Sequence, residues 1–223
     1  LMVLEGSPEL VLPNIVDRFS IDHVTTNFTP GWHEAQAIAF LEQKLPATLR
    51  VFRGNRLFDA EQFPFVIENL PDTFSPFRRK VEKLNVSSPL PAPDSLPPPP
   101  SAQFDAIPRS AVSPHPGLPL PGGTASGLRR LDQFLFQTHA IAEYKQTRND
   151  LDGLGGSSTL SPWLGNGALS ARTVAHAIFR YEREHLANES TYWLSFELLW
   201  REFFHWRAVI GGKSLFRQSG RSG

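Results

Sequence analysis

Hydrophobic and polar positions repeat with two different periods along the first part of the chain. Short alternating or apolar runs at 1–4, 22–26 and 48–52 predict β-strands, because successive side chains of a strand face opposite sides. Apolar residues three and four positions apart at 9–18 and 34–43 predict helices between them. Strands that alternate with helices are typical of an α/β fold, here a βαβ pattern without its beginning. No helix opens on Gly-x-Gly-x-x-Gly, so the dinucleotide fingerprint is absent.

The pattern after residue 122 is helical. Apolar positions within 126–144 fall on one side of a predicted helix. Ser161 stands before Pro162 as the N-cap of a second helix, and Ser170 caps a third at 171–183. The final predicted helix spans 191–209.

This final helix is apolar almost all round. One face carries Trp193, Glu197, Trp200, Arg201 and Phe204 at 3.6 residues per turn. Another face is lined by Tyr192, Phe196, Leu199 and Phe203. Such a helix belongs inside a large helical domain, yet few residues follow it. Together with a start at Leu1, this predicts a fragment of a longer protein.

A proline-rich stretch separates the two parts. Twelve of the 20 prolines lie between Pro89 and Pro121, which excludes a helix or a central strand there. We therefore predict an α/β part at 1–85, an extended linker at 86–121 and a helical part at 122–223. The 22 basic and 22 acidic residues cancel overall. The helical part has 12 basic and 9 acidic residues, a net charge of +3, so a polyanion should meet it first.

Composition excludes several kinds of site. Without cysteine the chain has no disulfide, thiolate zinc site, iron–sulfur cluster or thiol nucleophile. The seven histidines lack metal-ligand spacing, so we expect no metal. No Gly-x-Ser-x-Gly elbow anchors hydrolase chemistry. No apolar run could span a bilayer and no signal peptide is recognisable, which predicts a soluble intracellular protein of unknown compartment.

Two constellations allow either a structural or a functional interpretation. Glu197 and Arg201 are four residues apart on a predicted buried aromatic face, where they form either a helix ion pair or a functional pair. The hydroxyl-rich stretch 155–164 leads into a helix start, which suits phosphate oxygens. The structural alternative, which the residues alone favour, is an ordinary flexible loop with an N-cap. The Gly-Gly-Lys-Ser run at 211–214 is no P-loop, because Arg207 stands where a glycine is required.

Five segments, in order, resemble the photolyase/cryptochrome family and specifically its cryptochrome DASH branch. They are LPDTFSPFRRK at 70–80, PGGT at 121–124, YKQTRN at 144–149, SSTLSPWL at 157–164 and STYWLSFELLWREFF at 190–204. The resemblance runs from about residue 1 to 216 and is most specific from 144 to 204. It implies a truncated Rossmann-like antenna domain, an interdomain linker and the start of an all-helical FAD-binding domain.

The resemblance also implies roles for single residues. The positions that match the family's FAD contacts are Tyr144, Ser157, Ser158, Thr159, Leu160, Ser161, Trp193 and Arg201. Glu197 matches the carboxyl group that hydrogen-bonds a pyrimidine dimer, Trp200 the aromatic that packs on the flipped lesion, and Arg148 a DNA-phosphate contact. Glu34 lies near the family's folate-contacting acid, but residues 28–32 depart from the pattern and argue against a methenyltetrahydrofolate antenna.

Some positions depart from the DASH pattern. Thr159 stands where lysine is frequent, Asp150 replaces a usual glycine, and the Gly-Gly motif before Thr124 is one residue short. Each change weakens the attraction for the cofactor or for DNA. The helices that complete the family's flavin pocket and carry its electron-relay tryptophans are not in this chain.

The implied activity is that of a deoxyribodipyrimidine photo-lyase. In the full-length protein, expected to be a monomer, FAD-dependent blue-light chemistry would split cyclobutane pyrimidine dimers, preferably in single-stranded DNA. The alternatives are a FAD-binding blue-light photoreceptor without repair activity, or an inactive truncated product. We expect the fragment to be inactive alone.

Overall fold

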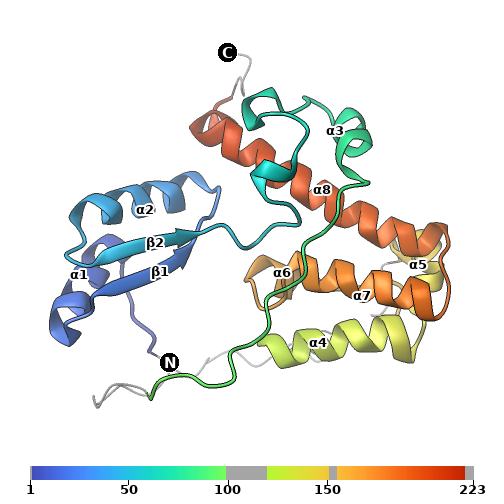
Figure 1. Ribbon diagram of the computed structural model, residues 1–223, viewed down its shortest axis with the longest axis horizontal. Coiled ribbons are helices and arrows are strands. Elements are labelled where there is room, and N and C mark those ends of the chain that lie inside the picture. The colour runs from blue at the N-terminus through green and yellow to red at the C-terminus, as the bar shows by residue number, and fades with distance from the viewer. Residues whose placement is uncertain (1, 99–119, 151–154, 219–223) are drawn as a thin grey trace. The chain divides into compact units, whose positions relative to one another are not determined.

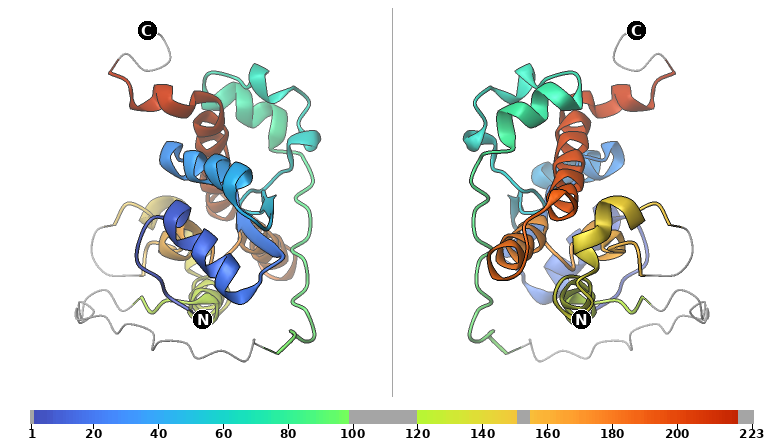
Figure 2. Two further views of the ribbon diagram at one scale, coloured as in Figure 1. Left: turned by 90° about the vertical axis from the view of Figure 1, so that its left-hand side faces the viewer. Right: turned by 90° about the vertical axis from the view of Figure 1, so that its right-hand side faces the viewer.

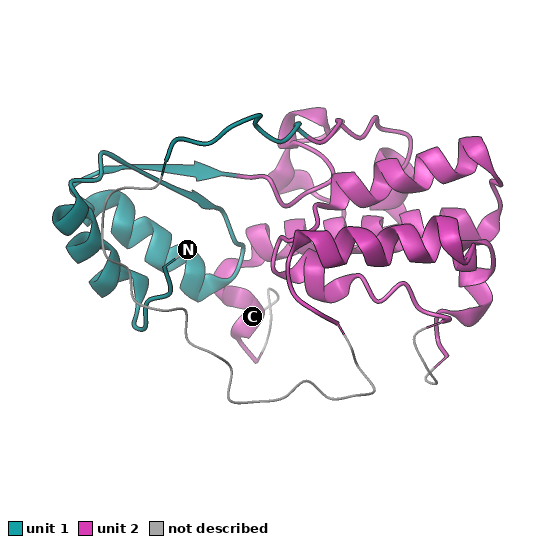
Figure 3. Cartoon of the chain, turned by 90° about the horizontal axis from the view of Figure 1, so that it is seen from below, with its two compact units in different colours: residues 1–52, 90–119 teal, residues 53–89, 120–223 magenta. Residues whose placement is uncertain are grey.

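The computed structural model describes residues 2–98, 120–150 and 155–218, which form two compact units (Figures 1 and 3). Of the described residues, 2–52 and 90–98 belong to the first unit, and 53–89, 120–150 and 155–218 belong to the second. The second unit thus begins before the predicted end of the α/β part at residue 85. The domain limits of the whole protein stay a prediction. Of the predicted linker, residues 99–119 lie outside the described residues, and 86–98 form neither helix nor strand.

The first unit has the predicted α/β character. Its elements are α1 (Pro8–Phe19), β1 (His23–Asn27), α2 (Trp32–Lys44) and β2 (Thr48–Phe52). The strands pair in parallel, with His23 opposite Thr48, as a βαβ crossover through α2 requires. Side chains alternate between exposed and half-buried along both strands, which confirms their predicted period of two. The strand predicted at 1–4 is wrong for residues 2–4, because no described strand pairs with them.

The second unit is helical. It contains α3 (Phe74–Val81), α4 (Thr124–Asp132), α5 (Tyr144–Thr147), α6 (Ser161–Gly165), α7 (Ala171–Glu184) and α8 (Glu189–Gly211). The helices predicted at 171–183 and 191–209 are confirmed as α7 and α8, and Ser170 caps α7 by accepting from the Thr173 N–H at 2.9 Å. The predicted N-cap Ser161 is instead the first residue of α6, after Leu160.

The single helix predicted at 126–144 is broken. After α4 the chain widens into a π-helical turn at Gln133–Gln137, closed by the bond from the Thr138 N–H to the Gln133 carbonyl at 2.9 Å. His139 then adopts a left-handed conformation with φ 54°, which ends the helix. A short 3-10 turn, Ala140–Glu143, leads into α5. The apolar period continues through the break, so the pattern alone could not reveal it.

α8 is the central element of the second unit. Figures 1 and 2 show α3 beside it, and the two helices are in contact. Phe77, Phe203 and Trp206 lie in one hydrophobic core that both helices contribute to. α7 also packs against α8. Segment 53–89 therefore supplies much of the apolar surface that covers α8, while Phe204 remains 61% exposed.

Candidate functional site

The start of α8 is set by its own sequence. The Asn188 side chain accepts hydrogen bonds from the N–H groups of Ser190 and Thr191, both at 2.9 Å, and the Thr191 hydroxyl accepts one from the Asn188 N–H at 3.0 Å. This reciprocal capping satisfies N–H groups that the first helical turn leaves free. The cap therefore fixes where the helix begins, and with it the register of the side chains that follow.

Glu197 lies at the centre of a polar and aromatic cluster. Its Oε1 accepts hydrogen bonds from Arg148 Nη1 and from Trp193 Nε1, each at 3.2 Å. The Arg148 guanidinium also lies 5.0 Å from the centre of the Trp193 ring, within cation–π range. The Glu197 side chain is 36% exposed, so the carboxylate is accessible to solvent. Arg148 and Trp193, which the resemblance assigned to DNA and to FAD, thus both contact the carboxylate that it assigned to the lesion.

The expected pair between Glu197 and Arg201 is not formed, and the interpretation of these residues as an ion pair is wrong. Arg201 instead donates to the Asn55 carbonyl at 3.1 Å and to the Asn55 side-chain oxygen at 2.7 Å. Its pKa is lowered, chiefly because burial disfavours its charge. The ion pair with Glu197 is formed instead by Arg148, which is 49 residues away in the sequence. Tertiary contacts therefore outweigh the i,i+4 spacing.

Tyr144 lies close to this cluster at the start of α5. Its side chain is buried and meets Phe134 edge to face, with ring centres 5.7 Å apart. Burial raises the pKa of the Tyr144 hydroxyl, and the negative charge of Glu197 adds to this rise, while Ser158 and Arg148 oppose it. The structure thus brings together Tyr144, Ser158, Arg148 and Glu197, which are widely separated in sequence.

The hydroxyl-rich segment is held at residues 157–159 by Arg130, a residue that no sequence motif indicated. Arg130, on α4, donates to the Ser157 carbonyl at 2.7 Å, the Ser158 carbonyl at 3.1 Å and the Thr159 hydroxyl at 2.8 Å. Leu160 is buried in the core and Ser161 is exposed, so these two neighbours differ in accessibility. The signal that could have indicated Arg130 is its place at the edge of the predicted apolar helix face at 126–144.

Trp200 is already in contact with other rings. It stacks on Phe74 with ring centres 3.7 Å apart and planes 11° apart, and lies at 5.4 Å and 22° from Phe204. Trp200 remains half-buried rather than fully enclosed. Its contact with Phe74 shows a core-packing role, and a role in packing on a nucleobase stays a prediction.

Comparisons with known proteins agree on one family. A family model for DNA photolyase matches residues 1–97. Cryptochrome DASH from Idiomarina loihiensis is 36% identical over 225 residues, which cover all of this chain and 50% of the relative. Cryptochrome DASH from Gloeobacter violaceus is 37% identical over 238 residues, covering all of this chain and 47% of the relative. The chain belongs to the photolyase/cryptochrome family, in its cryptochrome DASH branch.

A solved structure supports the assignment. The crystal structure of a Synechocystis cryptochrome matches with a TM-score of 0.81 and 35% identity, over 99% of this chain and 48% of that one. The chain therefore spans about half the length of the relatives it matches. The described residues contain no helix that is long and apolar enough to cross a membrane and no cluster of three metal-ligating side chains.

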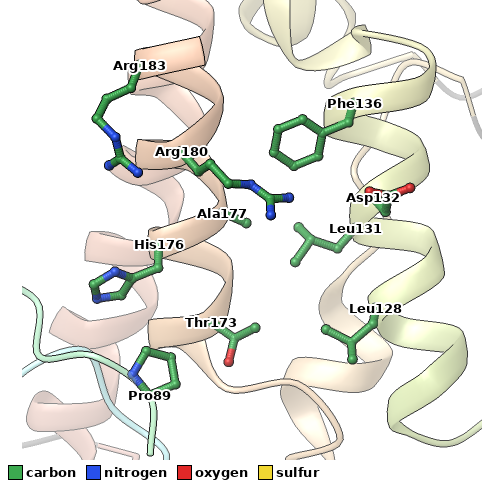
Figure 4. A pocket seen from close by; sticks show the side chains of 10 residues that line it. All are labelled: Pro89, Leu128, Leu131, Asp132, Phe136, Thr173, His176, Ala177, Arg180 and Arg183. Atoms are coloured by element: carbon green, nitrogen blue, oxygen red, sulfur yellow. The ribbon is translucent and has the colours of Figure 1, made fainter. Parts of the chain in front are cut away.

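Two cavities are lined by residues other than those of the polar cluster. Glu34 is exposed and lines a largely apolar cavity of about 530 Å³ between α1, β1 and α2 of the first unit. A groove of about 510 Å³ separates α4 from α7 in the second unit, where the Arg180 guanidinium lies 4.2 Å from the centre of the Phe136 ring (Figure 4). None of the residues assigned to FAD or DNA lines either cavity. Folate binding at Glu34 stays a prediction.

Another acid on α8, which no sequence motif indicates, is buried. Glu202 is fully buried, and its carboxylate accepts from the Leu57 N–H at 2.9 Å, the Phe58 N–H at 3.4 Å and Trp206 Nε1 at 2.9 Å. Burial raises the pKa of Glu202, and these donors and the Arg56 guanidinium oppose the rise. The carboxylate thus attaches the loop after β2 to α8. An acid in an aromatic helix gives no sign of such distant partners in the sequence.

We predict that the stability of the second unit falls in mild acid because of His205. Burial, and then the charges of Arg56 and Arg201, lower the pKa of His205 from 6.5 to about 4. As the pH falls, His205 therefore takes up a proton in the unfolded chain before it does so in the folded chain. The contribution of His205 to the free energy of unfolding is complete above pH 6.5 and is lost as the pH falls towards 4. We expect a loss of about 1–2 kcal/mol between about pH 7.5 and pH 5, allowing for the partial exposure of the ring.

Urea unfolding followed by tryptophan fluorescence at the two pH values measures this loss. The His205→Asn variant should show a weaker pH dependence, and the exposed His33, in the first unit, supplies the control variant His33→Asn. An unchanged pH dependence in His205→Asn would contradict the assignment.

Proposed function

We propose that the protein to which this chain belongs binds FAD and uses it for the blue-light-driven repair of cyclobutane pyrimidine dimers, preferably in single-stranded DNA. One observation carries the proposal. The Glu197 carboxylate, assigned to the lesion, lies within hydrogen-bond distance of Arg148 and Trp193 and close to Tyr144 and Ser158, assigned to DNA and FAD. A repair site needs the cofactor and the flipped base side by side.

The residues present are suited to FAD. Ser158 is buried, its N–H donates to no atom of the described residues, and Thr159 beside it has a left-handed backbone with φ 51°. Leu160 returns to the right-handed region, and such an alternation directs successive N–H groups to one side, where they can hold phosphate oxygens. We expect Tyr144, residues 157–161, Trp193 and Arg201 to hold the cofactor. FAD, when bound, supplies the light-driven electron transfer.

Glu197 and Trp200 offer what a flipped pyrimidine pair needs. A base outside the stack requires hydrogen-bond partners for its polar edge and an aromatic surface for its face. The half-exposed carboxylate supplies the first, and the ring of Trp200, held by Phe74, supplies the second. The Nε of Arg148 is buried and has no hydrogen-bond partner in the described part of the chain. It is therefore a donor that a ligand in this cluster could satisfy.

We predict that Glu197→Gln reduces dimer repair about 10- to 100-fold, because a hydrogen bond to a charged group is worth about 1.5–3 kcal/mol. The assay follows the disappearance of dimers from a single-stranded oligonucleotide under blue light, with the expressed full-length protein loaded with FAD. Glu189→Gln is the matched control, because Glu189 lies on the same helix with its side chain 82% exposed. Repair that is unchanged by Glu197→Gln would contradict the proposed role.

The same assay separates the enzyme from a light receptor. A full-length protein that retains FAD but splits no dimers supports a photoreceptor without repair activity. A full-length protein that retains no flavin would overturn the proposal. Visible absorption of the purified protein decides between these outcomes before any repair is measured.

A further inference from the structure

Arg130 donates three hydrogen bonds to the 157–159 segment. Its Nη2 donates to the Ser157 carbonyl at 2.7 Å, and its Nε is 3.1 Å from the Ser158 carbonyl and 2.8 Å from the Thr159 hydroxyl. The guanidinium also lies 5.6 Å from the centre of the Phe134 ring. A planar guanidinium presents its donors in a fixed fork, so three acceptors on successive residues define the position of this segment.

These contacts orient the peptide groups. In a trans peptide the N–H points opposite to the C=O of the preceding residue. Because the carbonyls of Ser157 and Ser158 turn towards Arg130, the N–H groups of Ser158 and Thr159 turn away from it. The Thr159 N–H is bonded to the Ser157 hydroxyl at 3.3 Å, whereas the Ser158 N–H donates to no described atom. A free N–H group is thus presented on the side opposite Arg130.

The segment would not adopt this shape without support. Thr159 is a β-branched residue with a positive φ, a conformation that costs about 1–3 kcal/mol and persists only where neighbouring contacts hold it. Arg130 contacts the Thr159 hydroxyl and the carbonyl immediately before it. The side chain of Arg130 is therefore placed where it can stabilise the strained residue.

We propose that Arg130 is the positioning residue that shapes segment 157–159 to receive the diphosphate of the cofactor, an inference that rests on the proposed function. Arg130 does this through the backbone of the segment, whose Ser158 N–H would face the ligand. Its positive charge lies directly behind the segment and adds attraction for an anion. Burial lowers the pKa of Arg130, but arginine stays charged in proteins.

Two ligands separate this role from general stability. FAD carries the diphosphate, and riboflavin carries the same ring system without phosphate. We expect Arg130→Gln to weaken FAD binding to the 223-residue chain at least about tenfold while riboflavin binding changes less than about twofold. Arg130→Lys keeps the charge but lacks the fork, so its loss should be smaller. Both affinities are measured by flavin fluorescence titration.

The neighbouring Arg129 is the matched control. It lies on the same helix one residue earlier, is exposed, and its side chain makes no hydrogen bond or ion pair in the described part of the chain. Arg129→Gln removes the same charge from α4 and should change FAD affinity less than about twofold. Equal weakening of FAD and riboflavin by Arg130→Gln would overturn the proposal, because it would show general damage. No change in either ligand would overturn it as well.

Amide hydrogen exchange tests the positioning without any ligand. We expect Arg130→Gln to speed exchange at residues 157–160 at least about tenfold, while exchange in α7 stays as in the unsubstituted chain. Unchanged exchange at 157–160 would overturn the positioning role. If the unsubstituted chain binds neither FAD nor riboflavin, the proposed cofactor site fails for this chain. The exchange result then decides the role of Arg130 by itself.

Discussion

Replacing Glu202 by alanine is expected to lower the free energy of unfolding by about 3–5 kcal/mol, the cost of removing one partner from a buried charged network. The substitution leaves the N–H groups of Leu57 and Phe58 and the Trp206 indole N–H without their acceptor. It also leaves Arg56, which is 5% exposed and lies over the Trp206 ring at 4.5 Å, without the nearest buried carboxylate. Chemical denaturation followed by tryptophan fluorescence measures the loss.

Two further variants make this result interpretable. Glu202→Gln keeps the shape and one acceptor oxygen but turns an NH₂ group towards donors, so we expect an intermediate loss. Glu189→Ala removes an exposed carboxylate from the same helix and should change stability far less. A loss of less than about 1 kcal/mol in Glu202→Ala would contradict the view that this carboxylate attaches the loop after β2 to α8.

Replacing Phe77 by alanine is expected to cost about 3–5 kcal/mol, as for other fully buried aromatic side chains. Phe77 is 0% exposed, and its ring meets Phe63 at 6.0 Å, Phe74 at 6.5 Å and Phe203 at 5.4 Å between ring centres. The change removes one of the two α3 rings that pack on α8, the other being Phe74. It therefore tests whether segment 53–89 is part of the helical core.

The control for Phe77 lies on α8 itself. Phe204 is 61% exposed, so Phe204→Ala should change the free energy of unfolding by no more than about 0.5 kcal/mol. Phe77→Leu keeps most of the buried area and should cost less than about 1.5 kcal/mol. The same denaturation assay applies to all three. Equal effects of Phe77→Ala and Phe204→Ala would show that α3 does not belong to the core in solution.

Stability and the proposed site are connected through α8. Glu202 and Phe203 fix the inward face of this helix, and Glu197 and Trp200 lie within two turns of them on its more exposed side. A helix turns as a rigid body, so the buried face determines where the site face points. We therefore expect the large stability losses to be accompanied by loss of flavin binding, whereas Glu197→Gln should leave stability almost unchanged.

Much of the local structure was predictable from the sequence. The βαβ order, α7 with its Ser170 cap, and α8 follow from apolar periods and capping residues, which act over a few neighbouring residues. The family followed from short motifs, and the comparisons confirm it. These features depend on which residues are adjacent along the chain, and that information is complete in the sequence.

Only the tertiary structure decided which partners the polar side chains choose. Glu197 pairs with Arg148 rather than Arg201, Arg130 holds the 157–159 segment, and Glu202 binds the loop after β2. These partners are separated by between 27 and 145 residues. The break between α4 and α5 was likewise invisible to an apolar period that continues through it. Spacing along a helix limits which contacts can form, but burial and competition among distant groups determine which of them does, because a buried polar atom must find its acceptor wherever the fold brings one.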